Sequence, residues 1–419
     1  MNIGVIGSGG REHSLCFKLL QSPKVKNIFC IPGNAGTDEI CKNLEVDIMN
    51  FNKLYLSIIK NNIKLIIVGP ETPLVYGITD FLQKKNVKVF GPSKKASQLE
   101  GSKIFMKNLC RKFDIPCAQY EEVTDIESAN KVLEKFNVPI VVKSDGLAAG
   151  KGVTICGSKD DALNDIKNIL NGKFNSSKKV IIEEFLEGEE ASYFVVTDGT
   201  NFKQIGTAQD HKRIGEGDTG LNTGGMGAYS PSQLINDEIE EKIINKIIIP
   251  TIKGMNEIGC KYKGILYAGL MIKNNEPKLI EYNIRFGDPE CQALMMRLED
   301  DLFDIILSTV DEKLDNKPIK WLPYPSITIV AASKGYPENF EIHKELSNLP
   351  KNDHRNEQIF HAGTKKINNK ILSTGGRVLN STVSLQSMKA SRDRAIEMLD
   401  QVKWTNKYYR KDIGWRVIK

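Results

Sequence analysis

The stretch LIEYNIRFGDPE, residues 279–290, decides how the rest of the chain is interpreted. Its first half alternates in character, and successive side chains of a strand point to opposite faces of a sheet. One predicted face holds Leu279, Glu281, Asn283 and Arg285. The other is apolar and belongs against a core: Ile280, Tyr282, Ile284 and Phe286. The Gly-Asp-Pro that follows has the chemistry of a turn that ends the strand.

The polar face places a carboxylate, an amide and a guanidinium in a row. Mg²⁺ takes oxygen ligands and commonly arrives with a phosphate, so Glu281 and Asn283 are candidate metal ligands. Arg285 beside them could hold an anion. A half-exposed strand with polar side chains in water explains the same pattern equally well. Other parts of the chain have to decide between the two.

Composition excludes several classes of protein. The chain has 419 residues, enough for two to four domains. Its 40% hydrophobic and 26% charged residues are ordinary for a soluble globular protein. The net charge of +6 is mild and no basic run is interleaved with aromatics, so we expect no nucleic-acid partner. No apolar run approaches the ~20 residues of a membrane span.

Cysteine usage and the N-terminus indicate a cytoplasmic protein. The eight cysteines are scattered singly, without a Cys-x-x-Cys pair, which favours reduced thiols. The first residues lead straight into an apolar strand, without a signal-peptide pattern. Only five histidines are present, so we expect no His-rich metal site.

Residues 1 to about 100 alternate short apolar strands with helical stretches, which predicts a parallel sheet covered by helices. A glycine loop, GSGGREH at residues 7–13, joins the first strand to the first helix and could bind a phosphate. It lacks the dinucleotide fingerprint, because Glu12 stands where glycine or alanine is needed and no acid follows the second strand. A phosphorylated small molecule fits better than NAD, and a turn without a ligand is the alternative.

A second glycine loop, SDGLAAGKGV at residues 144–153, follows a strand that ends in Lys143. It differs from the P-loop, because Asp145 replaces the first glycine and Gly152 replaces the Ser or Thr that would hold Mg²⁺. A plain hairpin is possible here. Lys143 and Lys151 nevertheless favour contact with phosphates, because ordering so much glycine costs conformational entropy.

Two further stretches have binding chemistry. Residues 180–186, VIIEEFL, form a predicted strand whose backbone could face an adenine, with a following carboxylate for a ribose. The basic cluster QDHKR at 209–213 precedes a glycine-rich loop at 218–229, as in an anion site under a mobile cover. His211 could act as an acid–base group, although we favour a hydrogen-bonded structural residue. Beyond about residue 321, short strands and a helix at 384–402 predict a small α+β cap.

Taken together, seven motifs in order resemble the phosphoribosylamine–glycine ligase family of ATP-grasp enzymes. They are GSGGREH (7–13), PGNAG (32–36), GPE (69–71), QDHKR (209–213), NTGGMG (222–227), RFGDPE (285–290) and FHAGT (360–364). The resemblance covers residues 3 to about 415. It implies an N-terminal parallel-sheet α/β domain (1–102), a central ATP-grasp domain (103–321, with a lid subdomain at about 118–188) and a small C-terminal α+β cap domain (322–419).

The resemblance also implies a reaction and its participants. ATP, glycine and 5-phosphoribosylamine would give glycinamide ribonucleotide, ADP and phosphate through glycyl phosphate, in de novo purine biosynthesis. Phosphoryl transfer of this kind needs positioning and charge neutralisation more than a covalent catalyst. We therefore expect ATP with Mg²⁺ (or Mn²⁺), small-molecule substrates, no nucleic acid, no membrane and, as a working expectation, a monomer.

Carried over by resemblance, the nucleotide would contact Lys103 and Lys143 (phosphates), Glu183, Glu184, Phe185 and Leu186 (adenine), Glu190 (ribose) and Asn222. The metal would bind Glu281 and Asn283. The substrates would contact Gly9, Gly10 and Arg11 (ribose phosphate), Asp210 and Asp288. We further infer that the transferring phosphoryl group and the acyl phosphate are stabilised by three cations: Lys212, Arg213 and Arg285.

One departure from the superfamily concerns the metal. Many ATP-grasp enzymes have a further acid on the preceding strand, but residues 266–271, LYAGLM, offer none. ATP oxygens and water must then complete the metal shell, so we expect weak metal binding without nucleotide. The rival hypotheses are an ATP-grasp ligase or carboxylase with another amine or acid, and a nucleotide-binding protein with a decayed site. Intact Glu281, Asn283, Lys103 and Lys143 argue against the second rival.

Overall fold

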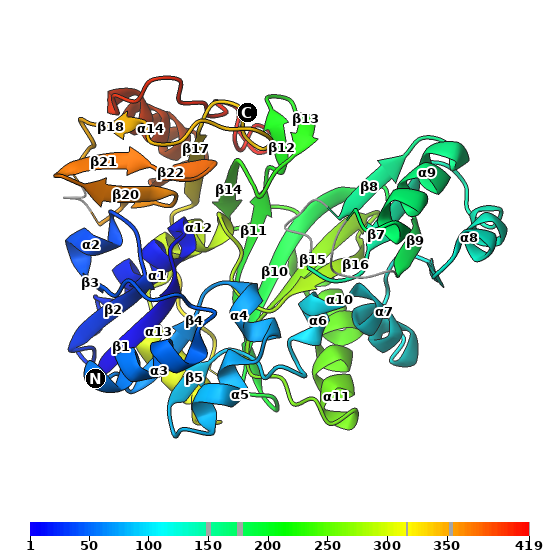
Figure 1. The fold of residues 1–419 in the computed structure, drawn as a ribbon, viewed down its shortest axis with the longest axis horizontal. Coiled ribbons are helices and arrows are strands. Elements are labelled where there is room, and N and C mark those ends of the chain that lie inside the picture. The colour runs from blue at the N-terminus through cyan, green and yellow to red at the C-terminus, as the bar shows by residue number, and fades with distance from the viewer. Residues whose placement is uncertain (148–151, 174–178, 316, 352–354, 419) are drawn as a thin grey trace.

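The computed structural model describes residues 1–147, 152–173, 179–315, 317–351 and 355–418. Within these ranges the chain forms five sheets. The N-terminal and C-terminal segments lie side by side at one side of a large central sheet, and a small lid projects at the other side (Figure 1). No helix of the described residues is both long enough and apolar enough to cross a bilayer.

The N-terminal segment is the predicted parallel α/β unit. Its sheet has the order β3-β2-β1-β4-β5, with every pair parallel. The strands are near-continuous apolar runs because helices cover both faces. The strands are β1 (Asn2–Gly7), β2 (Asn27–Pro32), β3 (Lys42–Asn43), β4 (Leu65–Val68) and β5 (Lys88–Phe90), and the helices are α1 (Gly10–Leu19), α2 (Thr37–Ile40), α3 (Phe51–Lys60), α4 (Glu71–Val75), α5 (Ile78–Gln83) and α6 (Gln98–Gly101).

The lid has a four-stranded antiparallel sheet and a hydrophobic core of its own, between that sheet and two helices. Its strand order is β6-β9-β7-β8, and the preceding helix α7 (Lys103–Lys112) leads into it. The elements are β6 (Tyr120–Val123), α8 (Ile126–Leu133), β7 (Ile140–Ser144), β8 (Val153–Cys156), α9 (Lys159–Leu170) and β9 (Val180–Glu184).

The central sheet continues without a break into the C-terminal segment. Its eight strands have the order β16-β15-β10-β11-β14-β17-β22-β19. Strand β14 therefore pairs directly with β17, although the predicted domain boundary at residues 321–322 separates them in the sequence. The elements up to residue 310 are β10 (Glu189–Thr197), β11 (Phe202–Asp210), β12 (Arg213–Gly215), β13 (Thr219–Asn222), β14 (Gly227–Ser230), α10 (Asp237–Ile243), the π-helical turn η1 (Ile244–Ile248), α11 (Ile249–Glu257), β15 (Gly264–Lys273), β16 (Glu276–Asn283), α12 (Glu290–Arg297) and α13 (Leu302–Val310).

The C-terminal segment adds a three-stranded sheet, β18-β21-β20, and a long helix that packs on β17 and β22. This is the predicted small α+β unit, although its main strands extend the central sheet. Its elements are β17 (Ser326–Ala332), β18 (Glu345–Leu346), β19 (Glu357–His361), β20 (Thr364–Ile367), β21 (Lys370–Ser373), β22 (Arg377–Ser384) and α14 (Met388–Gln401). All eight cysteines are free, as predicted.

The predicted alternation on β16 is wrong at its first two positions. The pairing with β15 shifts by one residue, so that Gly269 faces Glu281 but Leu270 faces Leu279. The bulge places Leu279 in the core and leaves Ile280 in the wall of the pocket. An extra residue in one strand reverses the alternation on one side of the bulge, which explains the error.

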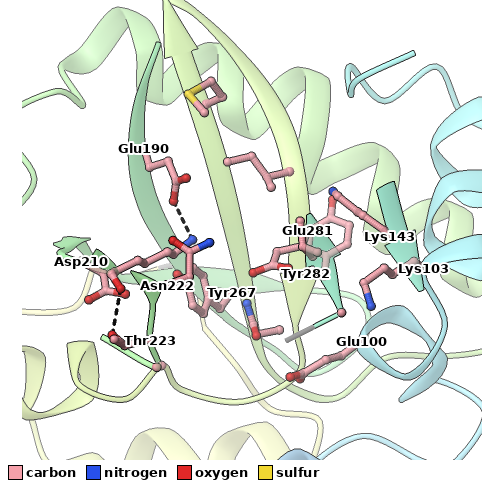
Figure 2. A pocket seen from close by; sticks show the side chains of 18 of the residues that line it. Glu100, Lys103, Lys143, Glu190, Asp210, Asn222, Thr223, Tyr267, Glu281 and Tyr282 are labelled. Carbon is pink, nitrogen blue, oxygen red and sulfur yellow. Dashed lines mark hydrogen bonds and ion pairs between the residues drawn. The ribbon is translucent and has the colours of Figure 1, made fainter. Parts of the chain in front are cut away.

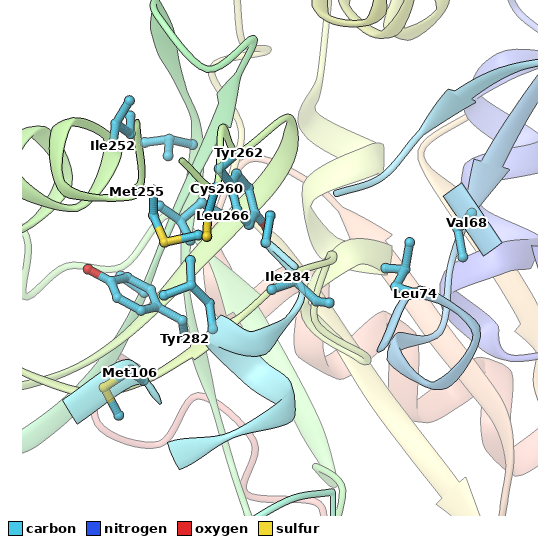
Figure 3. Close-up of a cluster of buried hydrophobic side chains, with 14 of the residues drawn as sticks. Val68, Leu74, Met106, Ile252, Met255, Cys260, Tyr262, Leu266, Tyr282 and Ile284 are labelled. Atoms are coloured by element: carbon cyan, nitrogen blue, oxygen red, sulfur yellow. The ribbon is translucent and has the colours of Figure 1, made fainter. Parts of the chain in front are cut away.

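The strand also ends earlier than predicted. β16 stops at Asn283, because the amide of Ile284 donates to the carboxylate of Glu100 (2.8 Å) instead of a neighbouring strand. Tyr282 and Ile284 still lie in the apolar cluster, together with Met255 of α11 (Figure 3). The predicted polar face from Glu281 onward therefore remains on the pocket side.

A buried histidine pair joins the N-terminal and C-terminal segments. The backbone amide of His361 donates to Nδ1 of His13 at 2.9 Å, and both rings are buried. Burial lowers the pKa of His13 well below its usual value and that of His361 to about 4. Protonation of His13 at Nδ1 would remove the acceptor of this hydrogen bond.

We expect the free energy of unfolding to fall as the pH drops from about 6.5, the unfolded histidine pKa, towards 4. In that window the unfolded chain binds protons that the folded histidines exclude, so acid favours unfolding. A histidine moved from about 6.5 to about 4 contributes up to about 3 kcal/mol. Urea unfolding at several pH values, in the wild type and in His361→Gln, measures this slope. If the unfolding free energy depends equally on pH in the two proteins, His361 does not cause the acid sensitivity.

Candidate active site

One pocket of about 790 Å³ lies between the lid, the N-terminal segment and the central sheet. Its wall includes the predicted strand end on β16, the end of β9 and the start of α7. Figure 2 shows Glu281 near its centre, with Lys103 and Lys143 on one side and Asp210 on the other. Segments more than 200 residues apart in the sequence therefore meet in one cavity.

All predicted site residues except Gly9 and Gly10 line this pocket. The list is Arg11, Lys103, Lys143, Glu183, Glu184, Phe185, Leu186, Glu190, Asp210, Lys212, Arg213, Asn222, Glu281, Asn283, Arg285 and Asp288. The polar side chains of β16 from Glu281 onward therefore face this pocket, which favours the binding-site interpretation over a plain exposed strand.

The carboxylate of Glu281 lies in a strongly positive environment. Its surrounding cations are Lys212, Lys143, Lys103 and Arg285. Burial acts to raise the pKa of Glu281, but these four charges outweigh burial and hold it below its usual value. Glu281 is therefore ionised at neutral pH, beside lysine side chains that could bind a phosphate.

Lys143 is held in place by a buried ion network. Its Nζ lies 2.9 Å from Oε2 of Glu183, whose other oxygen lies 3.2 Å from Nζ of Lys107. Lys107 is fully buried and donates to the carbonyl of Ala118. The side chain of Glu183 thus orients Lys143. Only the backbone of Glu183 remains free to contact an adenine base.

Glu184 also uses its side chain elsewhere. Its carboxylate accepts from the amide of Gln119 (3.0 Å) and from Lys278 (3.2 Å). Phe185 and Leu186 follow the end of β9 and line the pocket. Any contact of this segment with a base therefore falls on the backbone and on these two apolar side chains.

The second glycine loop is tied to the start of α7. Nζ of Lys103 donates to the carbonyl of Gly146 (3.0 Å), and Asp145 accepts from Ser102 Oγ (3.1 Å) and from the amide of Ile104 (3.2 Å). The predicted phosphate contact of Lys151 lies outside the described residues.

Arg285 lies between two carboxylates from the N-terminal segment. Its Nε is 3.1 Å from Oε2 of Glu71, and its Nη2 is 2.9 Å from Oε1 of Glu100. Burial raises the pKa of Glu100 to about 7, although Arg285 acts in the opposite direction. Both acids line the pocket, and our sequence analysis gave neither of them a role.

In the first glycine loop (residues 7–13), a side chain of the protein occupies the position expected for a phosphate. The carboxylate of Glu12 accepts from the amide of Gly9 (2.6 Å) and from Nε of Arg11 (2.5 Å). A Cβ on Gly10 would lie 2.3 Å from Asn380 Nδ2, so that residue is packed against the C-terminal segment. The amide of Gly9 is therefore not free for a phosphate in this structure, whereas the contact at Gly10 stays a prediction. Arg11 lines the pocket, with its guanidinium also donating to the carbonyl of Phe286.

Asp288 joins three parts of the chain. Its carboxylate accepts from the amide of Arg11 (3.3 Å) and from Gln292 Nε2 (2.9 Å), and lies 3.6 Å from Nη2 of Arg377. Burial acts to raise the pKa of Asp288, but Arg377 and Arg11 hold it below its usual value. Its position in the pocket wall agrees with the prediction, yet its oxygens already have partners within the protein.

Comparison with known proteins identifies the family. Family models match residues 1–100 (phosphoribosylglycinamide synthetase, N domain), 101–291 (ATP-grasp (A) domain) and 326–416 (C domain). Phosphoribosylamine–glycine ligase of Pasteurella multocida is 45% identical, covering 100% of this chain and 98% of the relative. That of Vibrio parahaemolyticus is 46% identical, covering 100% and 99%. The chain belongs to the phosphoribosylamine–glycine ligase family.

Solved structures agree with this family. The crystal structure of phosphoribosylamine–glycine ligase from Thermotoga maritima has a TM-score of 0.88 at 31% identity, covering 98% of this chain and 100% of that one. Biotin carboxylase of Campylobacter jejuni, at 15% identity, has a TM-score of 0.75 and covers 98% and 93%. The second likeness concerns the fold alone, which is the ATP-grasp fold predicted for this family.

The basic cluster of the phosphoribosylamine–glycine ligase motif QDHKR divides by role. Nζ of Lys212 lies 2.6 Å from Oε2 of Glu190, and Nη1 of Arg213 donates to the carbonyl of Gly220 (2.8 Å). His211 is buried, and its Nε2 accepts from the amide of Gly414 (3.1 Å). Burial lowers the pKa of His211 to about 4, which agrees with the favoured structural role.

The oxygen donors of this pocket fit a hard cation such as Mg²⁺. Glu281, ionised, and Asn283 line the same pocket as the lysines that could hold phosphates. Among the described residues no group of three or more His, Cys, Asp or Glu could hold a metal ion. These side chains allow a metal site with two protein ligands, Glu281 and Asn283, in which a nucleotide completes the coordination shell.

Proposed function

We propose that this chain ligates glycine to 5-phosphoribosylamine at the expense of ATP, giving glycinamide ribonucleotide, ADP and phosphate in de novo purine biosynthesis. Full-length similarity to phosphoribosylamine–glycine ligases supports the reaction. The observation that carries the proposal is the ionised Glu281 among four cations in a pocket walled by the lid. Such a site suits a metal-bound triphosphate beside a carboxylate substrate.

We infer that the nucleotide lies under the lid. Lys103 and Lys143 would bind its phosphates, because both project beside Glu281 in Figure 2. The backbone at Glu183 and Glu184, with Phe185 and Leu186, would face the adenine. Glu190, which pairs with Lys212, would reach the ribose, and Asn222 would contribute a further polar contact.

Glu281 and Asn283 would hold Mg²⁺ (or Mn²⁺), which would neutralise charge on the phosphates and orient them. Lys212, Arg213 and Arg285 would stabilise the phosphoryl group during transfer. Positioning and charge neutralisation are the main requirements of this chemistry, and no covalent protein nucleophile is needed.

The reaction divides into two balanced steps. A carboxylate oxygen of glycine attacks the γ-phosphorus, and the bond from that phosphorus to ADP breaks. The neutral amine of phosphoribosylamine then attacks the carbonyl carbon of glycyl phosphate. The C–O bond to phosphate breaks, and the amine loses a proton. Phosphoribosylamine would enter from the side of Arg11 and Asp288, with Gly9 and Gly10 shaping the wall behind Arg11.

We also infer three domains: residues 1–102 for substrate, 103–321 for the nucleotide with a lid at about 118–188, and 322–419 as a cap. The boundaries of the family models support this division. A cytoplasmic monomer that acts on small molecules, without nucleic-acid or membrane partners, completes the proposal.

Isotope transfer tests the proposed chemistry. Glycine labelled with ¹⁸O in its carboxylate should deliver one labelled oxygen to the released phosphate, because the C–O bond breaks in the second step. Phosphate is analysed by mass spectrometry after a single turnover. Unlabelled phosphate would contradict an acyl phosphate, because the product amide keeps only one carboxylate oxygen of glycine and the other would then have left as water.

Metal affinity without nucleotide should be low, because Glu281 and Asn283 alone supply protein oxygens to the ion. We expect Mg²⁺ to bind the nucleotide-free protein only in the millimolar range, a binding free energy of about −4 kcal/mol. Calorimetric titration with and without a non-hydrolysable ATP analogue measures the difference. Micromolar affinity in the absence of nucleotide would contradict the two-ligand site.

A further inference from the structure

The hairpin formed by β12 and β13 has little to hold it in place by itself. Among the described residues its two strands pair only with each other, and all four residues of β13 are exposed. An isolated two-stranded hairpin is only marginally stable in water. Arg213, Asp218 and Asn222 of this hairpin nevertheless line the pocket. Contacts from outside the hairpin must therefore fix its position.

The C-terminal tail, residues 408–416, supplies such contacts. Figure 1 shows this tail, in red, next to β12 and β13. The tail is itself anchored, because Ile413 is fully buried in the core of the C-terminal segment. Three hydrogen bonds join the tail to the hairpin: from Tyr408 Oη to the carbonyl of Ile214 (2.8 Å), from the amide of Gly217 to Asp412 (2.8 Å) and from the amide of Lys411 to Glu216 (3.0 Å).

Arg410 lies at the centre of this contact, and its side chain is completely buried. Its Nη1 donates to the carbonyl of Arg213 (3.0 Å) and to Oδ1 of Asp218 (2.9 Å). Its Nη2 donates to Oδ2 of Asp412 at 2.7 Å. One guanidinium thus connects the first residue of β12, the turn of the hairpin and the tail.

The turn of the hairpin has a conformation that needs support. Asp218 has a φ of 57°, in the left-handed region that residues other than glycine seldom adopt. Its carboxylate also accepts from Nη2 of Arg416 at 2.5 Å. Burial acts to raise the pKa of Asp218, but the hydrogen bond from Arg410 and the charge of Arg416 hold it below its usual value. Two arginines of the tail therefore fix this turn.

We propose that the C-terminal tail holds the β12–β13 hairpin over the pocket, and that Arg410 is a positioning residue that acts through Arg213 and Asn222. The inference rests on the proposed ligase function, in which Arg213 stabilises the phosphoryl group and Asn222 contacts the nucleotide. Arg410 does not line the pocket, so it acts by fixing the hairpin and not by touching a substrate. The buried His211, which accepts from the amide of Gly414 in the tail, holds the segment just before the hairpin in the same way.

A second arginine supports only the exit of the hairpin. Nη1 of Arg377 donates to the carbonyl of Gly224 (2.5 Å), and the hydroxyl of Tyr336 accepts from the amide of Gly224 (3.0 Å). These contacts lie beyond β13 and leave the turn at residues 216–218 to the tail. Loss of Arg410 should therefore loosen the hairpin while its exit stays fixed.

Hydrogen exchange tests this contact without any substrate. In Arg410→Met, we expect the amides of residues 213–222 to exchange at least about 10-fold faster than in the wild type, while those of β10 and β15 are unchanged. Mass spectrometry of peptic peptides measures both. Unchanged exchange of the hairpin in a folded variant would overturn the proposal. Asp218→Asn tests the same contact from the hairpin side if Arg410→Met fails to fold, because asparagine also tolerates the left-handed region.

Kinetics test whether the contact positions catalytic groups. We expect Arg410→Met to lower kcat for ADP formation about 10-fold and to raise the KM for ATP about 3- to 10-fold, with the KM for glycine within about threefold of the wild type. Arg410→Lys, which keeps the charge but has fewer donors, should lose less. In an Arg213→Ala background, Arg410→Met should lower kcat by less than about a further threefold, because the side chain through which it acts is already absent. A further 10-fold loss would overturn the positioning role.

Arg394→Met is the matched control. Arg394 also pairs with two carboxylates, Glu357 (2.9 Å) and Glu397 (3.0 Å), but it lies outside the pocket wall. Its hairpin exchange and its kinetic constants should match the wild type. A wild type that forms no ADP with glycine and phosphoribosylamine would overturn the ligase and the catalytic part of this proposal. Hydrogen exchange would still decide, separately, whether the tail holds the hairpin.

Discussion

Glu281→Gln should lower kcat/KM by about 10²- to 10³-fold, while the protein stays folded. Glu281 is the negative charge at the centre of a cluster of four cations, and its carboxylate is a proposed ligand of the metal. Glutamine has nearly the same shape but carries no charge. The variant would remove one negative charge from a pocket wall rich in lysine and arginine before ATP arrives, and would weaken metal binding once ATP is bound.

Steady-state ADP formation, with circular dichroism as a check of folding, measures this effect. Glu276→Gln is a matched control on the same strand, because Glu276 pairs with Lys242 and Lys246 on the exposed surface. Exposed ion pairs contribute little, so the control should keep wild-type activity. A Glu281→Gln enzyme within about threefold of the wild type in kcat/KM would remove Glu281 from the site.

Arg285→Met should damage catalysis and stability together. The guanidinium of Arg285 bridges Glu71 and Glu100, and its loss would leave two partly buried acids without a cation. Removal of one partner from a buried ion pair costs about 3–5 kcal/mol, which we discount to about 2–3 kcal/mol because Glu71 keeps some exposure. We expect kcat to fall about 10²-fold as well, because we propose that the arginine stabilises the transferring phosphoryl group.

A double-mutant cycle separates the two effects. Adding Glu100→Gln to Arg285→Met removes one carboxylate that has lost its cation. The double variant should therefore be more stable than Arg285→Met but should not recover activity. Urea unfolding and ADP formation are measured on all four proteins. Additive stability changes would show that Arg285 and Glu100 are not coupled, and would contradict a stabilising ion pair between them.

Local patterns predicted the class of fold and the polar face of β16, whereas most other residues of the pocket wall were predicted from the resemblance to the family. Alternation placed Glu281, Asn283 and Arg285 on one face, and the structure keeps them on the pocket side. The bulge that moves Leu279 and Ile280 depends on register with β15, which no local pattern specifies.

The occupied amide of Gly9 in the first glycine loop had a local signal. Glu12 lies three residues after Gly9, which is the spacing of a capping box, and its carboxylate takes the amide that a phosphate would need. The partners of the predicted cations had no such signal. Tertiary packing alone brings Glu100 to Arg285, which lies 185 residues later in the chain. It also brings Lys107 to Glu183.

The most direct measurement is ADP formation from ATP and Mg²⁺, with glycine and freshly generated phosphoribosylamine added separately and together. The proposed ligase predicts sustained ADP formation only with both substrates, in step with glycinamide ribonucleotide identified by mass spectrometry. ADP formation that ignores phosphoribosylamine but requires another amine or acid would contradict the assigned substrates, and ATP binding without any turnover would contradict the enzyme itself.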